Sequence, residues 1–209
     1  MITVIWDLDG TLIDSYPWIV GSLNEFAKKH NISCSKTEIY RILKQQSSVE
    51  LFEKFASELE MNFSEIKDMY RREFNDFDDK LMPMKSAIEI LEFLTSKNVI
   101  NYIYTHKGHT TNDVLQKNGM DKYFEDVVTS KNKLERKPKP DGLLYLIEKY
   151  DLNRENTYYV GDRNLDVVCA NNALVKSIFF DPEGSTDGVA DFNVKDLNEI
   201  RDILFKKSK

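Results

Sequence analysis

Short apolar runs that predict buried β-strands dominate the hydrophobic pattern of this chain. The first of them is continuous, is rich in β-branched residues and ends abruptly at a charged residue. The predicted strands are Thr3–Trp6, Val99–Tyr104, Asp126–Thr129, Thr157–Val160 and Ser177–Phe180. Between the later strands, apolar residues recur at helical spacing, as at Ala87, Ile90, Leu91 and Leu94, and at Leu143, Leu144 and Ile147. This alternation predicts an α/β fold with a doubly wound parallel sheet.

The interval between the first two predicted strands is too long for an ordinary crossover. A strand–helix–strand unit needs about 30 residues, but the second strand starts only near Val99. The excess lacks strand patterns and carries apolar residues at helical spacing, which are Val20, Leu23, Phe26, Ala27, Ile39, Ile42, Leu43, Leu51, Phe52, Phe55 and Leu59. We therefore predict an all-helical domain over residues 16–82, inserted into an α/β domain of residues 1–15 and 83–209. The acidic stretch Asn75–Asp79 and Pro83 mark its exit.

Composition narrows the classes of function. The 209 residues suffice for one core and a small second unit, and a net charge of −6 argues against a general nucleic-acid-binding protein. The two cysteines, Cys34 and Cys169, lie far apart, which favours reduced thiols over a disulfide. The sequence shows no signal peptide and no apolar stretch of membrane-spanning length. We expect a cytoplasmic protein without nucleic-acid or membrane partners, and the oligomeric state stays open.

The first predicted strand ends on two carboxylates, Asp7 and Asp9, in the segment Asp7–Leu12 (DLDGTL). Two acids in such a place repel each other and lose hydration, so a cation is required beside them. The carboxyl ends of strands are also where α/β sheets bind ligands. The segment therefore indicates a metal-assisted site with a carboxylate nucleophile, and Mg²⁺ suits its carboxylate and carbonyl oxygens.

Three later segments complete a pattern with this first one. Thr105 follows the second predicted strand, residues 136–140 are RKPKP, and residues 161–166 are GDRNLD. In this order and spacing the motifs resemble those of the haloacid dehalogenase-like hydrolase superfamily, and within it the phosphoglycolate phosphatase-like branch with a helical cap after the first motif. The resemblance covers essentially the whole chain, and the first and fourth motifs are its most specific parts. It implies that residues 16–82 form the cap domain.

The resemblance assigns roles to the acidic residues. Asp7 is the expected nucleophile, which forms an aspartyl-phosphate, and Asp9 is the expected general acid–base. The metal is expected on Asp7, on the backbone carbonyl of Asp9 and on Asp162, with Asp166 as a metal-shell or water-holding partner. An acid in the first turn of a helix is favourable in any protein, so Asp166 also has a purely structural explanation. The dehalogenase branch lacks the acid two residues after the nucleophile, so Asp9 argues for phosphoryl transfer.

Other residues are expected to contact the phosphoryl group. Thr105 would contribute its hydroxyl and His106 its backbone amide, while the imidazole of His106 adds a group that could touch the substrate. A lysine must neutralise the phosphoryl charge, and the Lys-Pro-x-Pro pattern favours Lys137, with Lys139 as the alternative. Arg163 either pairs with an acid of the core or touches the substrate.

The expected substrate contacts come from both parts of the chain. They are Gly10, Thr11, His106, Lys44 and Gln45. Gly10 would allow close backbone approach, and Thr11 could hydrogen-bond locally. The polar segment Lys44–Ser47 separates two predicted helices, and by analogy it is the cap loop that contacts the substrate. Trp18 is expected to pack in the inserted domain.

These motifs predict a Mg²⁺-dependent phosphatase that hydrolyses a small phosphorylated metabolite, with phosphoglycolate as the substrate that the resemblance suggests. A phosphomutase of the β-phosphoglucomutase type is the first alternative, because it uses the same core but returns the phosphoryl group to its substrate. A non-catalytic phosphate-binding module is the second. The presence of all the catalytic residues together weighs against it, since binding alone would not need them.

Overall fold

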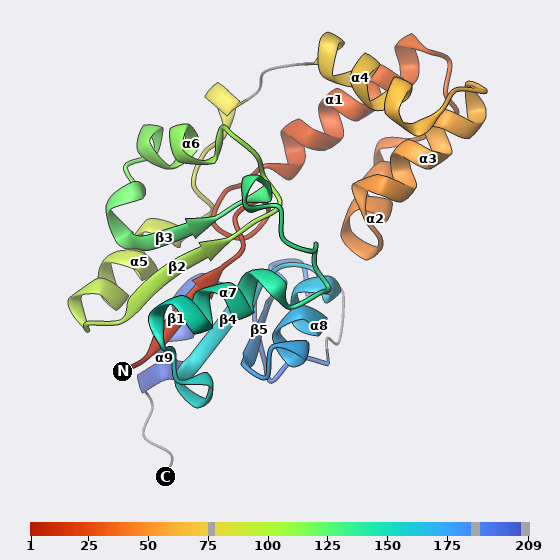
Figure 1. The fold of residues 1–209 in the computed structure, drawn as a ribbon. Coiled ribbons are helices and arrows are strands. Elements are labelled where there is room, and N and C mark those ends of the chain that lie inside the picture. Colours follow the sequence, from red (N-terminus) through yellow and green to blue (C-terminus); the bar gives the residue numbers. More distant parts are fainter. Residues whose placement is uncertain (75–77, 185–188, 206–209) are drawn as a thin grey trace. The chain divides into compact units, whose positions relative to one another are not determined.

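The structure is a computed structural model that describes residues 1–74, 78–184 and 189–205 and divides into two compact units (Figure 1). One unit is α/β and contains Met1–Asp14 and Met82–Lys209, and the other is helical and contains Ser15–Leu81. Residues 75–77, which begin the acidic stretch expected at the exit of the insert, lie outside the described residues. Within the described ranges, no helix is both long and apolar enough to cross a membrane.

A six-stranded sheet whose neighbouring strands are all parallel forms the centre of the α/β unit (Figure 1). Its strands are β1 (Thr3–Trp6), β2 (Ile100–Tyr104), β3 (Phe124–Val128), β4 (Thr157–Gly161), β5 (Lys176–Phe180) and β6 (Phe192–Val194). The order β3-β2-β1-β4-β5-β6 is the doubly wound arrangement, so the predicted fold class is confirmed. The sequence did not reveal β6, because this strand has three residues and buries only Val194.

The two strands that later carry the key acids, β1 and β4, lie side by side at the centre of the sheet. Every residue of both strands is buried, as expected for parallel strands that are covered on both faces. In register, Trp6 lies beside Val160, and the amide of Asp7 donates a hydrogen bond to the carbonyl of Val160 at 2.8 Å. The direction of strand addition reverses between β1 and β4, and sheets of this kind bind ligands outside the carboxyl ends at that point.

Helices cover both faces of the sheet. They are α5 (Ala87–Ser96), α6 (Thr111–Lys117), α7 (Asp141–Tyr150), α8 (Asn164–Asn172) and α9 (Ile200–Phe205). Short 3₁₀ helices in this unit are η2 (Asp121–Tyr123), η3 (Ser130–Asn132), η4 (Arg154–Asn156) and η5 (Leu197–Glu199). Leu143 and Leu146 of α7 and Cys169 of α8 share one buried cluster with residues of the sheet. Helices α5 and α9 pack together through Phe93 and Phe205, whose ring centroids are 5.7 Å apart.

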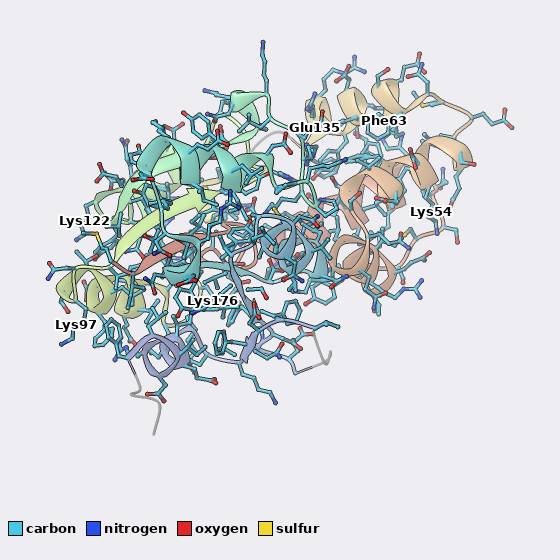
Figure 2. All side chains as sticks on the ribbon, turned by 60° about the horizontal axis from the view of Figure 1, so that its bottom comes forward. Lys54, Phe63, Lys97, Lys122, Glu135 and Lys176 are labelled. Atoms are coloured by element: carbon cyan, nitrogen blue, oxygen red, sulfur yellow. The ribbon has the colours of Figure 1, made fainter. Side chains whose placement is uncertain are left out.

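The helical unit has its own aromatic core. Its helices are α1 (Tyr16–Lys29), α2 (Lys36–Gln45), α3 (Ser48–Glu58), α4 (Phe63–Glu73) and the short η1 (Asp78–Lys80). Phe26 of α1 is fully buried, with ring centroids 6.0 Å from Phe55 and 5.6 Å from Tyr70. Phe63 of α4, which is labelled in Figure 2, packs edge-on against Phe52 of α3, with ring centroids 6.5 Å apart. The unit therefore buries an apolar core that is separate from that of the sheet.

The polar segment that was predicted as a loop over Lys44–Ser47 is shorter in the structure. Helix α2 continues to Gln45, Gln46 ends it, and Ser47 caps α3 by accepting a hydrogen bond from the amide of Val49 at 3.1 Å. The loop prediction was therefore wrong for Lys44 and Gln45, which belong to helix α2. A lysine in the last turn of a helix is favourable because it faces the negative end of the helix dipole.

The two points where the chain passes between the units are tied together within the α/β unit. Ile13 and Pro83 form an antiparallel bridge, and the amide of Asp14 donates to the carbonyl of Met82 at 3.0 Å. Both segments belong to the α/β unit. Contacts within the α/β unit therefore join the segment before the insert to the segment after it.

Candidate active site

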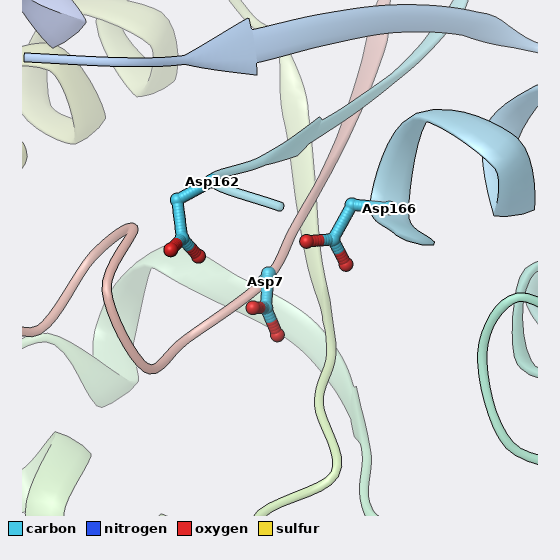
Figure 3. Close-up of side chains that lie close together, drawn as sticks. All are labelled: Asp7, Asp162 and Asp166. Atoms are coloured by element: carbon cyan, nitrogen blue, oxygen red, sulfur yellow. The ribbon is translucent and has the colours of Figure 1, made fainter. Parts of the chain in front are cut away.

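Three buried carboxylates meet at the carboxyl ends of β1 and β4 (Figure 3). Asp7 directly follows β1, Asp162 directly follows β4, and Asp166 lies in the first turn of α8. One oxygen from each lies within 4.8 Å of the other two, and at most 3% of any of these residues is exposed. The structure thus brings Asp7 of the first motif together with two acids of the fourth motif, Asp162 and Asp166.

The turn after β1 explains the local pattern of the first motif. The carbonyl of Leu8 accepts hydrogen bonds from the amides of Thr11, Leu12 and Ile13 at 3.2, 3.0 and 2.9 Å. Gly10 has a φ of +83°, which a residue with a side chain rarely adopts. This turn points the Thr11 hydroxyl at Asp162, to whose Oδ1 it donates at 3.2 Å. Thr11 is fully buried. Its hydrogen bond was predicted to be local, but it joins the first motif to the fourth.

Lys137 lies among the carboxylates with its side chain fully buried. Its Nζ donates to Asp7 Oδ1 at 2.8 Å, to Asp166 Oδ1 at 2.7 Å and to the hydroxyl of Tyr159 at 2.8 Å. An ammonium group has three protons to donate, so each has a partner here. Lys139, the alternative from the sequence, is exposed. The structure therefore places Lys137 beside the predicted nucleophile.

Burial and charge act in opposite directions on this cluster. Burial raises the pKa of Asp7 to about 7, with further increases from Asp166 and Asp162, although Lys137 opposes the shift. Burial alone would lower the pKa of Lys137, but the carboxylates of Asp166 and Asp7 outweigh it and hold that pKa above its ordinary value. Lys137 therefore stays positive while it compensates the acids.

Asp166 has three hydrogen-bond partners besides its place near the other acids. Its Oδ1 accepts from Lys137 and from the hydroxyl of Tyr159, and its Oδ2 accepts from the backbone amide of Arg163 at 3.1 Å, which caps α8. The close approach of the Asp166 side chain to the end of β4 requires glycine at position 161, because a Cβ there would lie 2.4 Å from the Cβ of Asp166. Asp166 thus fixes the start of α8 and the ammonium of Lys137, and its predicted role toward a metal stays a prediction.

Thr105, His106 and Asp9 complete the predicted set in the α/β unit. Thr105 is buried at the end of β2, and its hydroxyl accepts from the amide of Lys107 at 3.1 Å. The imidazole of His106 accepts a hydrogen bond at Nε2 from the backbone amide of Lys137 at 2.9 Å, and its contact with a substrate stays a prediction. Asp9 Oδ1 is buried and has no hydrogen-bond partner among the described residues.

The sequence of this chain was compared with protein families and with known proteins. The family model described as haloacid dehalogenase-like hydrolase matches residues 4–180. The chain belongs to the haloacid dehalogenase-like hydrolase family. The pyrophosphatase PpaX of Oceanobacillus iheyensis is 27% identical to it over 177 residues, which cover 84% of this chain and 81% of that protein. A phosphoglycolate phosphatase of Agrobacterium fabrum is 28% identical over 200 residues, which cover 92% and 84%.

The fold of this haloacid dehalogenase-like hydrolase also has solved counterparts. A crystal structure of a subfamily IA hydrolase of the same superfamily, from Geobacter sulfurreducens, matches with a TM-score of 0.75 at 21% identity. The match covers 98% of this chain and 96% of that one. At this identity the likeness concerns the fold.

The oxygen atoms of this hydrolase's site fit a divalent cation. Carboxylate oxygens are the ligands that Mg²⁺ prefers, and Asp7, Asp162 and Asp166 offer them within 4.8 Å of one another. Lys137 supplies one buried positive charge against these three acids. Burying acids without compensation is costly, so the negative charge that remains favours a cation.

Sequence reasoning missed one residue of the site in this hydrolase, Tyr159. Its hydroxyl accepts from Lys137 and lies 3.2 Å from both the carbonyl of Tyr104 and Oδ1 of Asp166, and the residue is 1% exposed. A tyrosine in a buried strand resembles an ordinary core residue. The available signal was its position two residues before Gly161, which places it near the end of β4.

The other predicted substrate contacts, Lys44 and Gln45, lie in the helical unit at the end of α2. The Nζ of Lys44 lies 5.0 Å from the centre of the Tyr16 ring, a cation–π distance. Tyr16 in turn packs edge-on against Tyr40 at 5.3 Å. These contacts hold Lys44 against α1, and its contact with a substrate stays a prediction.

Proposed function

We propose that this hydrolase is a Mg²⁺-dependent phosphatase of small phosphorylated metabolites. The observation that carries the proposal is the ammonium of Lys137, held 2.8 Å from Asp7 and 2.7 Å from Asp166. In-line phosphoryl transfer needs a nucleophile surrounded by positive charge, with few other demands on the protein. A buried carboxylate beside a fixed lysine, at the open end of two central strands, supplies that combination.

In the first step, a carboxylate oxygen of Asp7 attacks phosphorus and the bond from phosphorus to the leaving oxygen breaks. Asp9 donates a proton to that oxygen, so a phosphate ester releases an alcohol and pyrophosphate releases protonated phosphate. Asp7 then carries the phosphoryl group as an aspartyl-phosphate. Thr105 and the backbone amide of His106 bind phosphoryl oxygens, and Lys137 balances their charge.

In the second step, Asp9 accepts a proton from a water molecule, which attacks phosphorus. The bond between phosphorus and the Asp7 oxygen breaks, which restores the carboxylate and releases inorganic phosphate. The unpartnered Oδ1 of Asp9 supports this role, because a proton carrier must not be occupied by protein donors. Asp7, the backbone carbonyl of Asp9 and Asp162 would hold Mg²⁺, which would supply further positive charge at the phosphoryl group.

The helical unit is proposed as the cap that selects the substrate. The two kinds of relatives are named for pyrophosphate and phosphoglycolate. Both compounds are small, and both carry a second anionic group close to the phosphoryl group. We therefore propose a substrate of this class, with Lys44 and Gln45 as the cap residues that contact it.

The test is phosphate release by the purified protein. The substrates are p-nitrophenyl phosphate, phosphoglycolate, pyrophosphate and a hexose phosphate, each with Mg²⁺ and with excess EDTA. We expect activity that EDTA abolishes and Mg²⁺ restores, and Asp7→Asn should lower kcat at least about 1000-fold. Asp14→Asn is the matched control, because Asp14 is an exposed acid in the same segment.

Three results would contradict the proposal. The first is activity of Asp7→Asn equal to that of the control, which would remove the nucleophile. The second is an isomerised hexose phosphate without phosphate release, which would identify the phosphomutase alternative. Activity that persists in EDTA after dialysis would remove the metal from the reaction.

A further inference from the structure

The segment that carries Lys137 is held by side chains at several backbone positions. We define residues 135–139 as the lysine loop; it starts at Glu135, which is labelled in Figure 2. The donors to its carbonyl groups are Tyr104 Oη to Glu135 at 3.3 Å, Asn172 Nδ2 to Pro138 at 2.9 Å and Cys169 Sγ to Lys139 at 3.2 Å. These side chains come from β2 and α8, so the sheet and a helix both fix the loop.

His106 makes a different kind of contact with the same loop. Its Nε2 accepts the backbone N–H of Lys137 itself at 2.9 Å. Lys137 is 6% exposed, so water does not readily replace this acceptor. An unpaired buried amide is costly, and the hydrogen bond to His106 avoids that cost.

This geometry specifies the protonation state of the ring. Nε2 accepts a hydrogen bond only when the imidazole is neutral and carries its hydrogen on Nδ1. The surroundings favour the neutral ring, because burial, assisted by the positive charges of Lys137, Arg136 and Arg163, lowers the pKa of His106 to about 2. Its ring also packs edge-on against Tyr104 at 6.0 Å.

We propose that His106 is a positioning residue for Lys137, whose backbone it fixes through Nε2 so that the ammonium is shared between Asp7 and Asp166. The inference rests on the proposed function, since it explains how the lysine of that reaction is placed. A lysine side chain has four flexible carbons, so the position of its ammonium depends on where its backbone is held. A displacement of about 1 Å in a catalytic group can cost about 100-fold in rate.

The first test measures the tautomer of His106 in the wild-type protein by long-range ¹H–¹⁵N NMR. The chain has three histidines, and the signal lost in His106→Gln identifies the relevant one. We expect the Nδ1–H tautomer, with ¹⁵N shifts that do not change from about pH 5 to 9. A ring with hydrogen on Nε2, or one that titrates in this range, overturns the proposal. This measurement requires neither substrate nor metal.

The second test compares two substitutions of the same residue in the Mg²⁺-loaded enzyme. His106→Leu removes the acceptor and should lower kcat roughly 10- to 100-fold, with KM changed less than about threefold. His106→Gln keeps an acceptor oxygen near the position of Nε2, so its kcat should return to within about threefold of wild type. His109→Leu is the matched control, because His109 is exposed on the same connection, and it should have no effect.

The outcomes separate this inference from the proposed function. Equal losses in His106→Leu and His106→Gln would overturn the acceptor role, as would a His106→Leu enzyme with wild-type kcat. A wild-type protein without phosphatase activity would instead count against the proposed function, and the tautomer would still decide whether His106 holds the lysine loop. If His106→Leu does not fold, His106→Gln and the NMR measurement decide.

Discussion

Replacing Lys137 by methionine tests whether the buried charges of the site depend on one another. Methionine approximates the lysine stem in size and lacks the ammonium that compensates Asp7 and Asp166. Breaking a buried ion pair by removing one partner typically costs about 3–5 kcal/mol. We expect the free energy of unfolding of the metal-free α/β unit to fall by about that amount at pH 8.

The effect should depend on pH in a definite direction. The pKa of Asp7 is about 7 in the folded protein and 3.8 without these surroundings, so between these values the folded state binds more protons. Stability from this group is therefore fully present at low pH and is lost as pH rises through about 7. Loss of the lysine removes the positive charge that opposes the raised pKa of Asp7. Lys137→Met should therefore lose more free energy of unfolding at pH 8 than at pH 5.5.

The assay uses urea unfolding followed by tryptophan fluorescence. The chain has two tryptophans; Trp6 is fully buried in β1, whereas Trp18 belongs to the helical unit and is 39% exposed. In a Trp18→Phe background, fluorescence therefore reports on the α/β unit alone. Lys139→Met is the matched control and should change stability by less than about 0.5 kcal/mol, because Lys139 is exposed.

A double-mutant cycle makes the reasoning refutable. If Lys137 and Asp166 compensate each other, Lys137→Met combined with Asp166→Asn should lose less than the sum of the single losses, by about 0.5–3 kcal/mol. Strict additivity, or a Lys137→Met loss no larger than that of Lys139→Met, would show that the pair contributes nothing and that the electrostatic account is wrong.

Three further predictions concern other residues. Asp9→Asn should show a burst of p-nitrophenolate followed by slow turnover, because the activated ester needs no proton but breakdown of the phosphoenzyme needs a base; a rate close to wild type with an alkyl phosphate would contradict this. Substituting Lys44 and Gln45 by alanine should change the rates with phosphoglycolate and pyrophosphate more than the rate with p-nitrophenyl phosphate, and equal effects would argue against substrate contact. His106 stays neutral when folded, so as pH falls below about 6.5 only the unfolded state takes up its proton, and stability should fall by at most about 1.4 kcal/mol per pH unit. The denaturation midpoint of His106→Gln should not show this loss of stability at low pH. An identical pH dependence in wild type and variant would refute the prediction.

The strands that carry the site could be predicted because burial leaves a direct mark on sequence. Strands β1 and β4 are buried throughout, and both appear as uninterrupted apolar runs. Strand β3 begins at Phe124, two residues before the predicted start, because it is only half-buried and tolerates Glu125 and Asp126. A pattern based on apolar residues alone finds the start of such a strand poorly.

The reactive residues of the site could be predicted from the sequence better than the contacts that hold them. Carboxylates at strand ends have few structural explanations, so Asp7 and Asp162 stood out from the sequence. Tyr159 did not stand out, and the contact of the His106 ring with Lys137 was not predicted, because both depend on partners that only the folded chain supplies: Lys137 contacts Tyr159 with its side chain and His106 with its backbone. Residue types suggest a reaction, whereas the contacts that position and orient those residues depend on tertiary structure.

The antiparallel bridge between Ile13 and Pro83 has a consequence for how such a protein can change in evolution. Since the α/β unit itself holds both ends of the insert together, the entropy of closing that loop grows only logarithmically with its length. Inserts of very different size can therefore be exchanged at this position at small cost to the stability of the sheet. An insert can then be replaced without moving the buried acids or Lys137, because all of them lie in the α/β unit.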